Sequence, residues 1–366
     1  MLQMKVIILG GGQATRLHPL TCNTVKIMIP VLNRPLLEHL IGYLKKHSIS
    51  GIILALGNRQ LHQVRSYFGD GSKFDVKIDY SVEDFPMGTA GAVKNAEALL
   101  DDEPFTVFNG DIFTDINLGA MIELHHHRRA LVSIALTTVE DPTAYGVLET
   151  DAEGKVKRFV EKPKWDDVNS NMINAGVYIL ESEILSYITP GVFSMFERDV
   201  FPQLLDDGRN VYSYPSNDYW IDTGTPEKYL RLNCDLIHRY LGNDVKFEGE
   251  SVVHRRAQID GPVLIGKSCS IDRNSVIKGP AVLGADCQIG EGAEIEKAVL
   301  WQNCQIDRRA RLENCILAYN CHIEEESELE RGCVLGDNVR IGKRNRLPHG
   351  TRIWPDKYIE PNETSF

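Results

Sequence analysis

Residues 5–30 read KVIILGGGQATRLHPLTCNTVKIMIP, and this stretch sets the interpretation of the N-terminal part of the chain. Residues 5–9 predict a buried strand, and three glycines follow at its carboxyl end. A glycine run in this place lets backbone N–H groups converge on phosphate oxygens. Because Arg16 and Lys26 lie in the same segment, we interpret it as a loop that binds a polyphosphate. A plain strand-to-helix turn with surface charges stays open as the alternative.

Two better-known phosphate loops do not match this segment. A P-loop requires GxxxxGK followed by serine or threonine, and the Gly-Lys pair is missing. A dinucleotide-binding loop requires GxGxxG and an acidic residue about twenty positions later, and the chain has neither the third glycine nor that acid. The remaining interpretation uses arginine and lysine side chains as fixed cations around the phosphates.

Strand and helix patterns alternate over the first two thirds of the chain. Further strands are expected at 52–56, 76–82, 105–108 and 131–138, with helical periodicity between them. The short segments within 145–185 look more antiparallel. This order predicts a Rossmann-like α/β fold with a mixed, mainly parallel sheet, whose ligands bind at the carboxyl ends of strands. The NGD motif at 109–111 falls at such an end.

After about residue 250 the pattern changes to a repeat of six. Aliphatic residues recur at this spacing from Ile265 to Leu347, with two steps of five, and a mostly small side chain lies two positions before each. The fifteen hexads predict a left-handed parallel β-helix of about five coils. Six of the eight cysteines occupy the small positions, so we interpret them as buried packing residues. The predicted organisation is a catalytic domain at 1–242, a linker at 243–260 and the β-helix at 261–366.

Composition narrows the classes of partner. The formal charge of −11 argues against nonspecific binding to nucleic acid or to an anionic membrane surface. No apolar run approaches the roughly 20 residues that a membrane helix needs. We therefore expect a cytoplasmic protein with reduced thiols, small-molecule substrates, and neither nucleic acid nor membrane as a partner.

A series of motifs carries a family resemblance. In chain order they are GGGQATRLHPLTCNTVKIMIPVLNRP, EDFPMGTAGA, NGD, YGV, FVEKP, NAGVYIL and WIDTGTPEKY. This ordered series, followed by the hexads, resembles the sugar-phosphate nucleotidyltransferases over nearly the whole chain. Three positions depart from the family pattern, with Ala14 in place of a glycine and Val25 and Ile27 in place of prolines. Since alanine is small, we expect the loop at Ala14 to close normally.

The resemblance implies a reaction in which a sugar 1-phosphate attacks a nucleoside triphosphate, with Mg²⁺ as cofactor. It implies catalytic roles for Arg16, Lys26, Asp111, Lys162 and Asp222, of which Asp111 and Asp222 hold the metal. It places the nucleotide against Leu9, Gly10, Gly11, Gly12, Thr15, Glu83, Gly88 and Thr89. It places the sugar against Gly146, Glu161, Asn174 and, less firmly, Thr223.

Several functions stay open within this resemblance. The motif series is most similar to the mannose-1-phosphate guanylyltransferase branch, which implies GTP and mannose 1-phosphate as substrates. Thymidylyl-, uridylyl- or adenylyltransferases that use glucose 1-phosphate share most of the residues, and a regulatory subunit that senses nucleotide-sugars without turnover is a further alternative. An acyltransferase activity of the β-helix would need a histidine such as His254, His322 or His349, but none has a convincing setting. We expect the β-helix to mediate homo-oligomer contacts instead.

Overall fold

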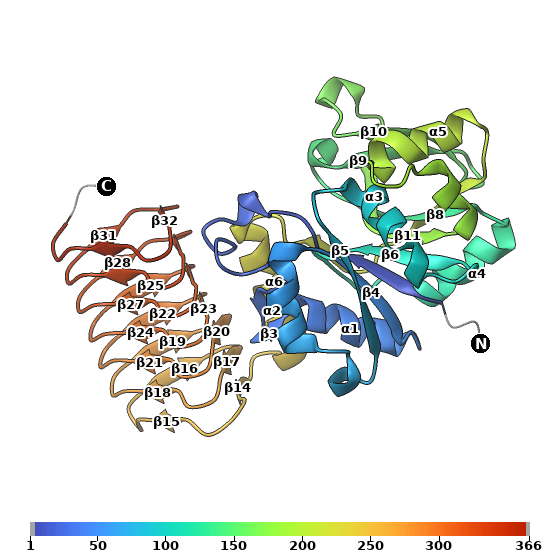
Figure 1. The fold of residues 1–366 in the computed structure, drawn as a ribbon. Helices are drawn as coiled ribbons and strands as arrows, with labels where there is room; N and C mark the ends of the chain where they lie inside the picture. The colour runs from blue at the N-terminus through green and yellow to red at the C-terminus, as the bar shows by residue number, and fades with distance from the viewer. Residues whose placement is uncertain (1–3, 364–366) are drawn as a thin grey trace. The chain divides into compact units, whose positions relative to one another are not determined.

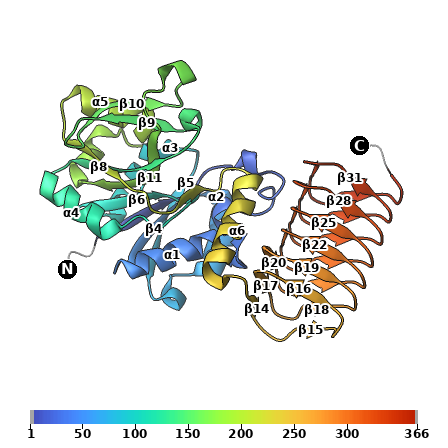
Figure 2. The same cartoon turned by 180° about the vertical axis from the view of Figure 1, so that it is seen from behind.

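The computed structural model describes residues 4–363, and these residues fall into two compact units. The first unit holds the chain up to Gln13 together with Leu37–Asp222. The second unit holds Ala14–Leu36 and the chain from Thr223 onward. The segment that carries Arg16 and Lys26 therefore belongs to the same unit as the C-terminal repeats. Figures 1 and 2 show the elements of each unit from opposite sides.

A nine-stranded sheet forms the centre of the first unit (Figure 1). Its strands are β1 Val6–Leu9, β4 Gly51–Gly57, β5 Lys77–Glu83, β6 Phe105–Asn109, β8 Val132–Thr138, β9 Gly146–Thr150, β10 Val156–Glu161, β11 Met172–Leu180 and β12 Val211–Pro215. The order is β10-β9-β11-β6-β1-β4-β5, and β8 pairs with both β11 and β12. Strands β6, β1, β4 and β5 are parallel, whereas β11 runs antiparallel to β6, β8 and β9. The expected mixed, mainly parallel sheet is confirmed.

Both faces of this sheet are covered. Val6, Ile7 and Ile8 are all fully buried, although successive residues of a strand point to opposite faces. The α-helices of the first unit are α1 Leu36–Lys46, α2 Asn58–Phe68, α3 Gly88–Asn95, α4 Leu118–Arg128 and α5 Phe201–Asp206. Short 3-10 turns at Ser72–Phe74, Glu97–Leu99, Pro142–Ala144, Trp165–Asp167 and Ser182–Tyr187, and a π-turn at Phe196–Val200, complete it.

The C-terminal repeats form a left-handed parallel β-helix with three parallel sheets (Figures 1 and 2). One face carries β14 Val245–Phe247, β17 Val263–Ile265, β20 Ala281–Leu283, β23 Val299–Leu300, β26 Ile316–Leu317, β29 Val334–Leu335 and β32 Arg352–Ile353. The second carries β15 Val252–Val253, β18 Ser270–Ile271, β21 Gln288–Ile289, β24 Gln305–Ile306, β27 His322–Ile323, β30 Arg340–Ile341 and β33 Tyr358–Ile359. The third carries β16 Gln258–Asp260, β19 Val276–Lys278, β22 Glu294–Glu296, β25 Arg311–Glu313, β28 Glu328–Leu329 and β31 Arg346–Leu347.

The hexad residues meet in register between coils, as their spacing predicts. Ile271 lies opposite Ile289, and Ile289 lies opposite Ile306. The aliphatic side chain of each coil therefore stacks on the corresponding side chain of the next coil inside the β-helix. The six cysteines of the repeat are buried and unpaired. Their interpretation as small packing residues is therefore confirmed.

The residues expected to form a linker, 243–260, carry the first coil of the β-helix. In the register between coils, Phe247 lies opposite Ile265, Val253 opposite Ile271, and Ile259 opposite Ile277. These three are themselves six positions apart, so the repeat begins one coil earlier than expected. The repeat also continues beyond Leu347, through β32 and β33.

The remaining elements of the second unit come from two distant parts of the chain. The segment Ala14–Leu36 contains 3-10 turns at Thr15–Leu17 and Lys26–Met28 and the short strands β2 Pro30–Val31 and β3 Arg34–Pro35. Helix α6, Pro226–Leu241, precedes the β-helix. Thr225 caps α6 by accepting a hydrogen bond from the Lys228 amide, and proline occupies its first turn, as the sequence predicts.

Candidate active site

The glycine loop and the NGD motif lie at the same edge of the sheet. β1 and β6 are parallel neighbours, with Leu9 opposite Asn109. The Gly110 amide donates a hydrogen bond to the Leu9 carbonyl oxygen at 2.9 Å. Gly10 and Asp111 therefore follow adjacent strands at their carboxyl ends, where ligands of parallel sheets bind.

A two-stranded ribbon brings the two predicted metal ligands together. Strand β7, Ile112–Thr114, pairs antiparallel with β13, Trp220–Asp222, and Asp222 lies opposite Ile112. Asp111 directly precedes Ile112, and residues opposite each other in such a pair are about 4.5–5.5 Å apart at Cα. Asp222 is 7% exposed, and its carboxylate accepts a hydrogen bond from the Tyr145 hydroxyl at 2.6 Å. The backbones of two aspartates that are far apart in the sequence thus lie close together in the first unit.

Glu83 lies against the glycine loop. A Cβ atom on Gly11 would come within 3.0 Å of a Glu83 carboxylate oxygen, so this approach depends on the absence of a side chain. The same carboxylate accepts a hydrogen bond from the Met87 amide at 3.1 Å. Burial raises the pKa of Glu83 above its ordinary value, and the Met87 hydrogen bond opposes this rise.

Thr89, which follows the turn after β5, contacts Glu197, a residue for which the sequence predicted no role. The Thr89 hydroxyl donates to Glu197 at 2.8 Å and accepts from the Phe196 amide at 2.9 Å. Gly88 has φ +75°, and a Cβ there would lie 2.4 Å from the Ser194 carbonyl oxygen, so glycine is required. The structure therefore uses the Thr89 hydroxyl to hold Glu197.

Glu197 connects this turn to the predicted sugar residues. Glu197 is 8% exposed, and its carboxylate also accepts a hydrogen bond from the Tyr178 hydroxyl at 3.1 Å. Asn174 donates to the same hydroxyl at 2.7 Å and accepts from the Gly176 amide at 2.9 Å. A carboxylate, a phenol and an amide thus form one hydrogen-bonded network on β11 and the segment after it. No local pattern in the sequence marks Glu197.

Strands β9 and β10 bring two predicted sugar residues, Gly146 and Glu161, close to Lys162. Gly146 is the register partner of Glu161, and a Cβ on Gly146 would lie 2.6 Å from the Phe159 ring and 3.0 Å from Glu161. Burial, with the nearby Glu197 charge, raises the pKa of Glu161. Lys162 has φ +49°, which turns the chain sharply, and its Nζ atom lies 3.8 Å from the Glu161 carboxylate. An ammonium and a carboxylate are therefore presented side by side at the end of β10.

Four predicted site residues belong to the second unit. Thr15 and Arg16 lie exposed on the first 3-10 turn, Lys26 is half-buried on the second, and Thr223 is fully buried. The loop closes at Ala14 in a left-handed conformation, with φ 52° and ψ 37°. Its carbonyl oxygen accepts from the Thr21 hydroxyl at 2.9 Å. The left-handed conformation costs a residue with a side chain about 1–2 kcal/mol, a cost that glycine avoids.

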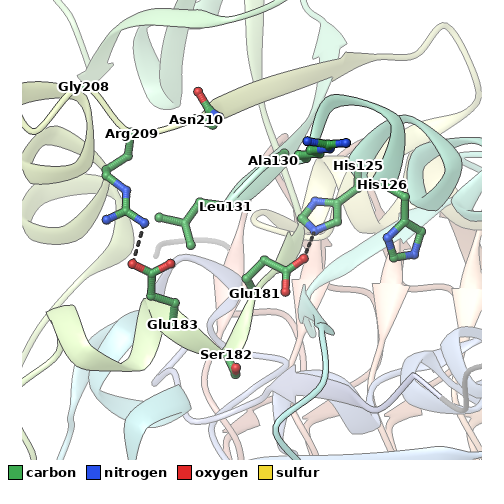
Figure 3. A pocket seen from close by; sticks show the side chains of 11 residues that line it. His125, His126, Ala130, Leu131, Glu181, Ser182, Glu183, Gly208, Arg209 and Asn210 are labelled. Atoms are coloured by element: carbon green, nitrogen blue, oxygen red, sulfur yellow. Dashed lines mark hydrogen bonds and ion pairs between the residues drawn. The ribbon is translucent and has the colours of Figure 1, made fainter.

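His125 and His126, from a run of three histidines at 125–127, line a cavity with a volume of about 550 Å³ (Figure 3). His125 is buried and hydrogen-bonds Ser133 at 2.9 Å and Glu181 at 3.3 Å. Across this cavity Arg209 pairs with Glu183 (Figure 3). These residues lie where β8 begins and the antiparallel β11 ends, which is the sheet edge opposite Asp111. Within residues 4–363 no group of three or more His, Cys, Asp or Glu side chains could hold a metal ion.

The buried His125 should make the protein acid-sensitive. Burial lowers its pKa to about 4, so between pH 6.5 and 4 the unfolded chain takes up a proton that the folded chain does not. Folding stability is therefore lost as pH falls through this window, by about 2 kcal/mol between pH 7 and 5. His125→Gln should remove this part of the pH dependence in urea unfolding at the two pH values. The exposed His127→Gln variant is the control, and equal slopes for both variants would contradict the assignment.

None of the described helices is long and apolar enough to cross a membrane.

Comparison with known proteins identifies the family. Residues 5–239 match the nucleotidyl transferase family model, and residues 239–347 match the model of the EIF2B subunit epsilon LbH domain. The chain belongs to the nucleotidyl transferase family, which confirms the resemblance read from its motifs.

Individual relatives agree with this classification. A mannose-1-phosphate guanyltransferase of Candida albicans is 34% identical over 363 residues, covering 98% of both chains. A mannose-1-phosphate guanylyltransferase of Mycobacterium tuberculosis is 36% identical and covers 72% of this chain and 74% of its own length. A UTP–glucose-1-phosphate uridylyltransferase of Synechocystis is 32% identical and covers 81% and 82%. The crystal structure of HddC from Yersinia pseudotuberculosis with GMP-PN has a TM-score of 0.56 at 29% identity, covering 64% of this chain and 99% of that one.

Proposed function

We propose that the protein transfers a nucleotidyl group from GTP to mannose 1-phosphate, giving GDP-mannose and pyrophosphate. The proposed reaction class rests on one observation. On the β7–β13 ribbon Asp222 lies opposite Ile112, the residue after Asp111, and Gly110 is hydrogen-bonded to Leu9 at the end of the strand that leads into the glycine loop. The choice of GTP and mannose 1-phosphate is supported by the curated relatives that match nearly the whole chain.

In the reaction one bond to the α-phosphorus forms and another breaks. A phosphate oxygen of the sugar 1-phosphate attacks, and the bond to the β-phosphate breaks, so the electron pair leaves with pyrophosphate. The nucleophile is already an anion, and no strong base is required. Since both reactants are negatively charged, alignment and charge neutralisation are the main tasks of the protein. We assign Arg16 and Lys26 to the triphosphate and Lys162 to the sugar phosphate.

Asp111 and Asp222 fit a magnesium ion. Mg²⁺ is usually bound by one or two carboxylates and completes its shell with water and substrate phosphates. When bound, the ion supplies positive charge to the phosphate oxygens. Tyr145 orients the Asp222 carboxylate by donating a hydrogen bond to one of its oxygens.

The sugar pocket is assigned to the hydrogen-bonded network of the first unit. Glu161 offers carboxylate oxygens to sugar hydroxyls, and Gly146 leaves the room for it. Asn174 is held in place by Tyr178 and the Gly176 amide. For the nucleotide, Leu9, Gly10, Gly11, Gly12 and Thr15 supply the loop, and Glu83, Gly88 and Thr89 supply the following turn.

An assay of every substrate pair tests this proposal. Purified protein with Mg²⁺ is given GTP, UTP, dTTP or ATP together with mannose or glucose 1-phosphate, and pyrophosphate release is measured. We expect kcat/KM for GTP with mannose 1-phosphate to exceed every other pair at least about tenfold. A higher value for UTP or dTTP with glucose 1-phosphate would overturn the substrate choice. Tight binding of a nucleotide-sugar without any pyrophosphate release would favour the regulatory alternative.

We further propose that the protein forms homo-oligomers through the β-helix. The exposed aromatic side chains Trp354 and Tyr358 on its last coil support this. Light scattering at two protein concentrations checks the assembly state, and a purely monomeric species would contradict it.

A further inference from the structure

The segment Ala14–Leu36 is held by the β-helix and α6 at several points, although at least about 190 residues separate them in sequence. This segment carries Arg16 and Lys26, the cations assigned to the triphosphate. All of the contacts below lie within the second unit.

The first contact point is Arg352 on β32. Its guanidinium donates to the His18 carbonyl oxygen at 3.4 Å and to the Glu227 carboxylate at 3.1 Å. His18 directly follows the 3-10 turn that carries Arg16, and Glu227 lies in the first turn of α6. Arg352 therefore joins the last coils of the β-helix to the end of the Arg16 turn.

The second contact point is Asp337. Asp337 is 7% exposed and lies in the turn after β29. It accepts from the Tyr319 amide at 3.1 Å and from the Asn23 side chain. Asn23 is exposed and lies three positions before Lys26. A buried carboxylate that lost these donors would be costly, so the pairing holds the segment in one position.

The end of the segment is fixed by two further contacts. Trp301 is 1% exposed and donates to the Tyr229 hydroxyl at 2.9 Å, and Tyr229 donates to the Pro30 carbonyl oxygen. Asn33 donates to Glu248 at 2.8 Å and to the Leu283 carbonyl oxygen at 3.0 Å. Lys26 therefore lies between two fixed stretches of backbone.

We propose that Asp337 and Arg352 are positioning residues, through which the β-helix sets the placement of Arg16 and Lys26 on the triphosphate. This inference rests on the proposed function, because it assigns the two cations to a nucleotide. A misplacement of about 1 Å at a binding group can lower a rate by about 10²-fold. The β-helix then acts in nucleotide binding, in addition to any role in assembly.

Arg352→Ala tests the first contact, with Arg331→Ala as its matched control. Arg331 is an exposed arginine whose guanidinium pairs with Glu313 inside the β-helix. We expect Arg352→Ala to lower kcat/KM for the nucleotide about tenfold and to change KM for the sugar 1-phosphate less than twofold. Arg331→Ala should leave both values unchanged. If Arg352 had a merely structural role, KM would rise by the same factor for the nucleotide and for the sugar 1-phosphate. That result would overturn the proposal.

Asp337 is tested by a pair of variants. Asp337→Asn keeps an oxygen that accepts hydrogen bonds, whereas Asp337→Ala keeps none. We expect the asparagine variant to retain a nucleotide KM within about twofold of the parent and the alanine variant to raise it about fivefold or more. Equal nucleotide KM values for the two variants and the parent protein would overturn the role of Asp337.

Hydrogen exchange of the full chain without substrate separates this inference from the proposed function. Peptides covering 14–26 should exchange faster in Arg352→Ala and Asp337→Ala than in the parent or in Arg331→Ala. Unchanged exchange there would overturn the positioning role, whatever the kinetics. A parent protein without turnover on any substrate pair would overturn the proposed function, while faster exchange would still support the contact.

Discussion

Asp222→Asn should lower kcat/KM about 10³-fold with either substrate varied, while the melting temperature changes little. Asparagine keeps the oxygen that accepts the Tyr145 hydrogen bond, so the ribbon of β7 and β13 should stay intact. It loses the negative charge that we propose binds a divalent cation. Removing one group that stabilises charge in the transition state typically costs 10²–10³-fold, and loss of a metal ligand adds to this. The apparent Mg²⁺ requirement should also move to higher concentration.

Two further variants sharpen this test. Asp206→Asn alters an exposed aspartate at the end of α5 and should leave the kinetics unchanged. The double variant with Asp111→Asn should be little slower than the single variants, because two ligands of one ion act as a unit. If Asp222→Asn kept a third of the parent activity, or if the two single losses multiplied, the shared metal site would be wrong.

The sequence predicted what depends on local periodicity. The hexad repeat predicted the β-helix because the aliphatic residue of each hexad has the same environment in every coil. The same signal was present before Ile265, where Val245, Ser251 and Ala257 lie two positions before Phe247, Val253 and Ile259. Extending the count backwards would have moved the start of the β-helix by one coil. Residues 243–260 were predicted to be a linker because the repeat was recognised only from Ile265 onward. The residues of the first coil already show the same hexad pattern.

Other features depend on side chains that meet across the fold, and they leave no periodic trace. Glu197 becomes part of the site only because Thr89 and Tyr178 donate to it from other elements. The pairing of Asn23 with Asp337 joins residues more than 300 positions apart. The register that places Asp222 opposite Ile112, the residue after Asp111, could not be predicted from spacing alone. Sequence patterns thus give elements and candidate groups, while hydrogen bonds across the fold decide which groups act together.

Trp301→Ala should destabilise the second unit by about 3–5 kcal/mol, the range for removing a buried aromatic side chain. Trp301 follows the hexad residue Leu300 and points out of the prism, yet it is 1% exposed. The rings of Tyr229 and Tyr319 contact it edge-on, at centroid distances of 6.4 Å and 4.8 Å. Alanine would leave a cavity between α6 and the β-helix and would remove the donor to Tyr229.

Two comparisons separate packing from the hydrogen bond in this position. Trp301→Phe keeps a six-membered aromatic ring and loses the indole N–H with the rest of the five-membered ring, so it should cost less than alanine, about 2 kcal/mol in urea unfolding followed by circular dichroism. Trp165→Ala removes a tryptophan that is 61% exposed and should cost less than about 1 kcal/mol. If Trp301→Ala cost no more than Trp165→Ala, α6 would not be packed on the β-helix through Trp301. The Tyr229 link to Pro30 would then have no rigid support, since its hydroxyl depends on the indole for its position.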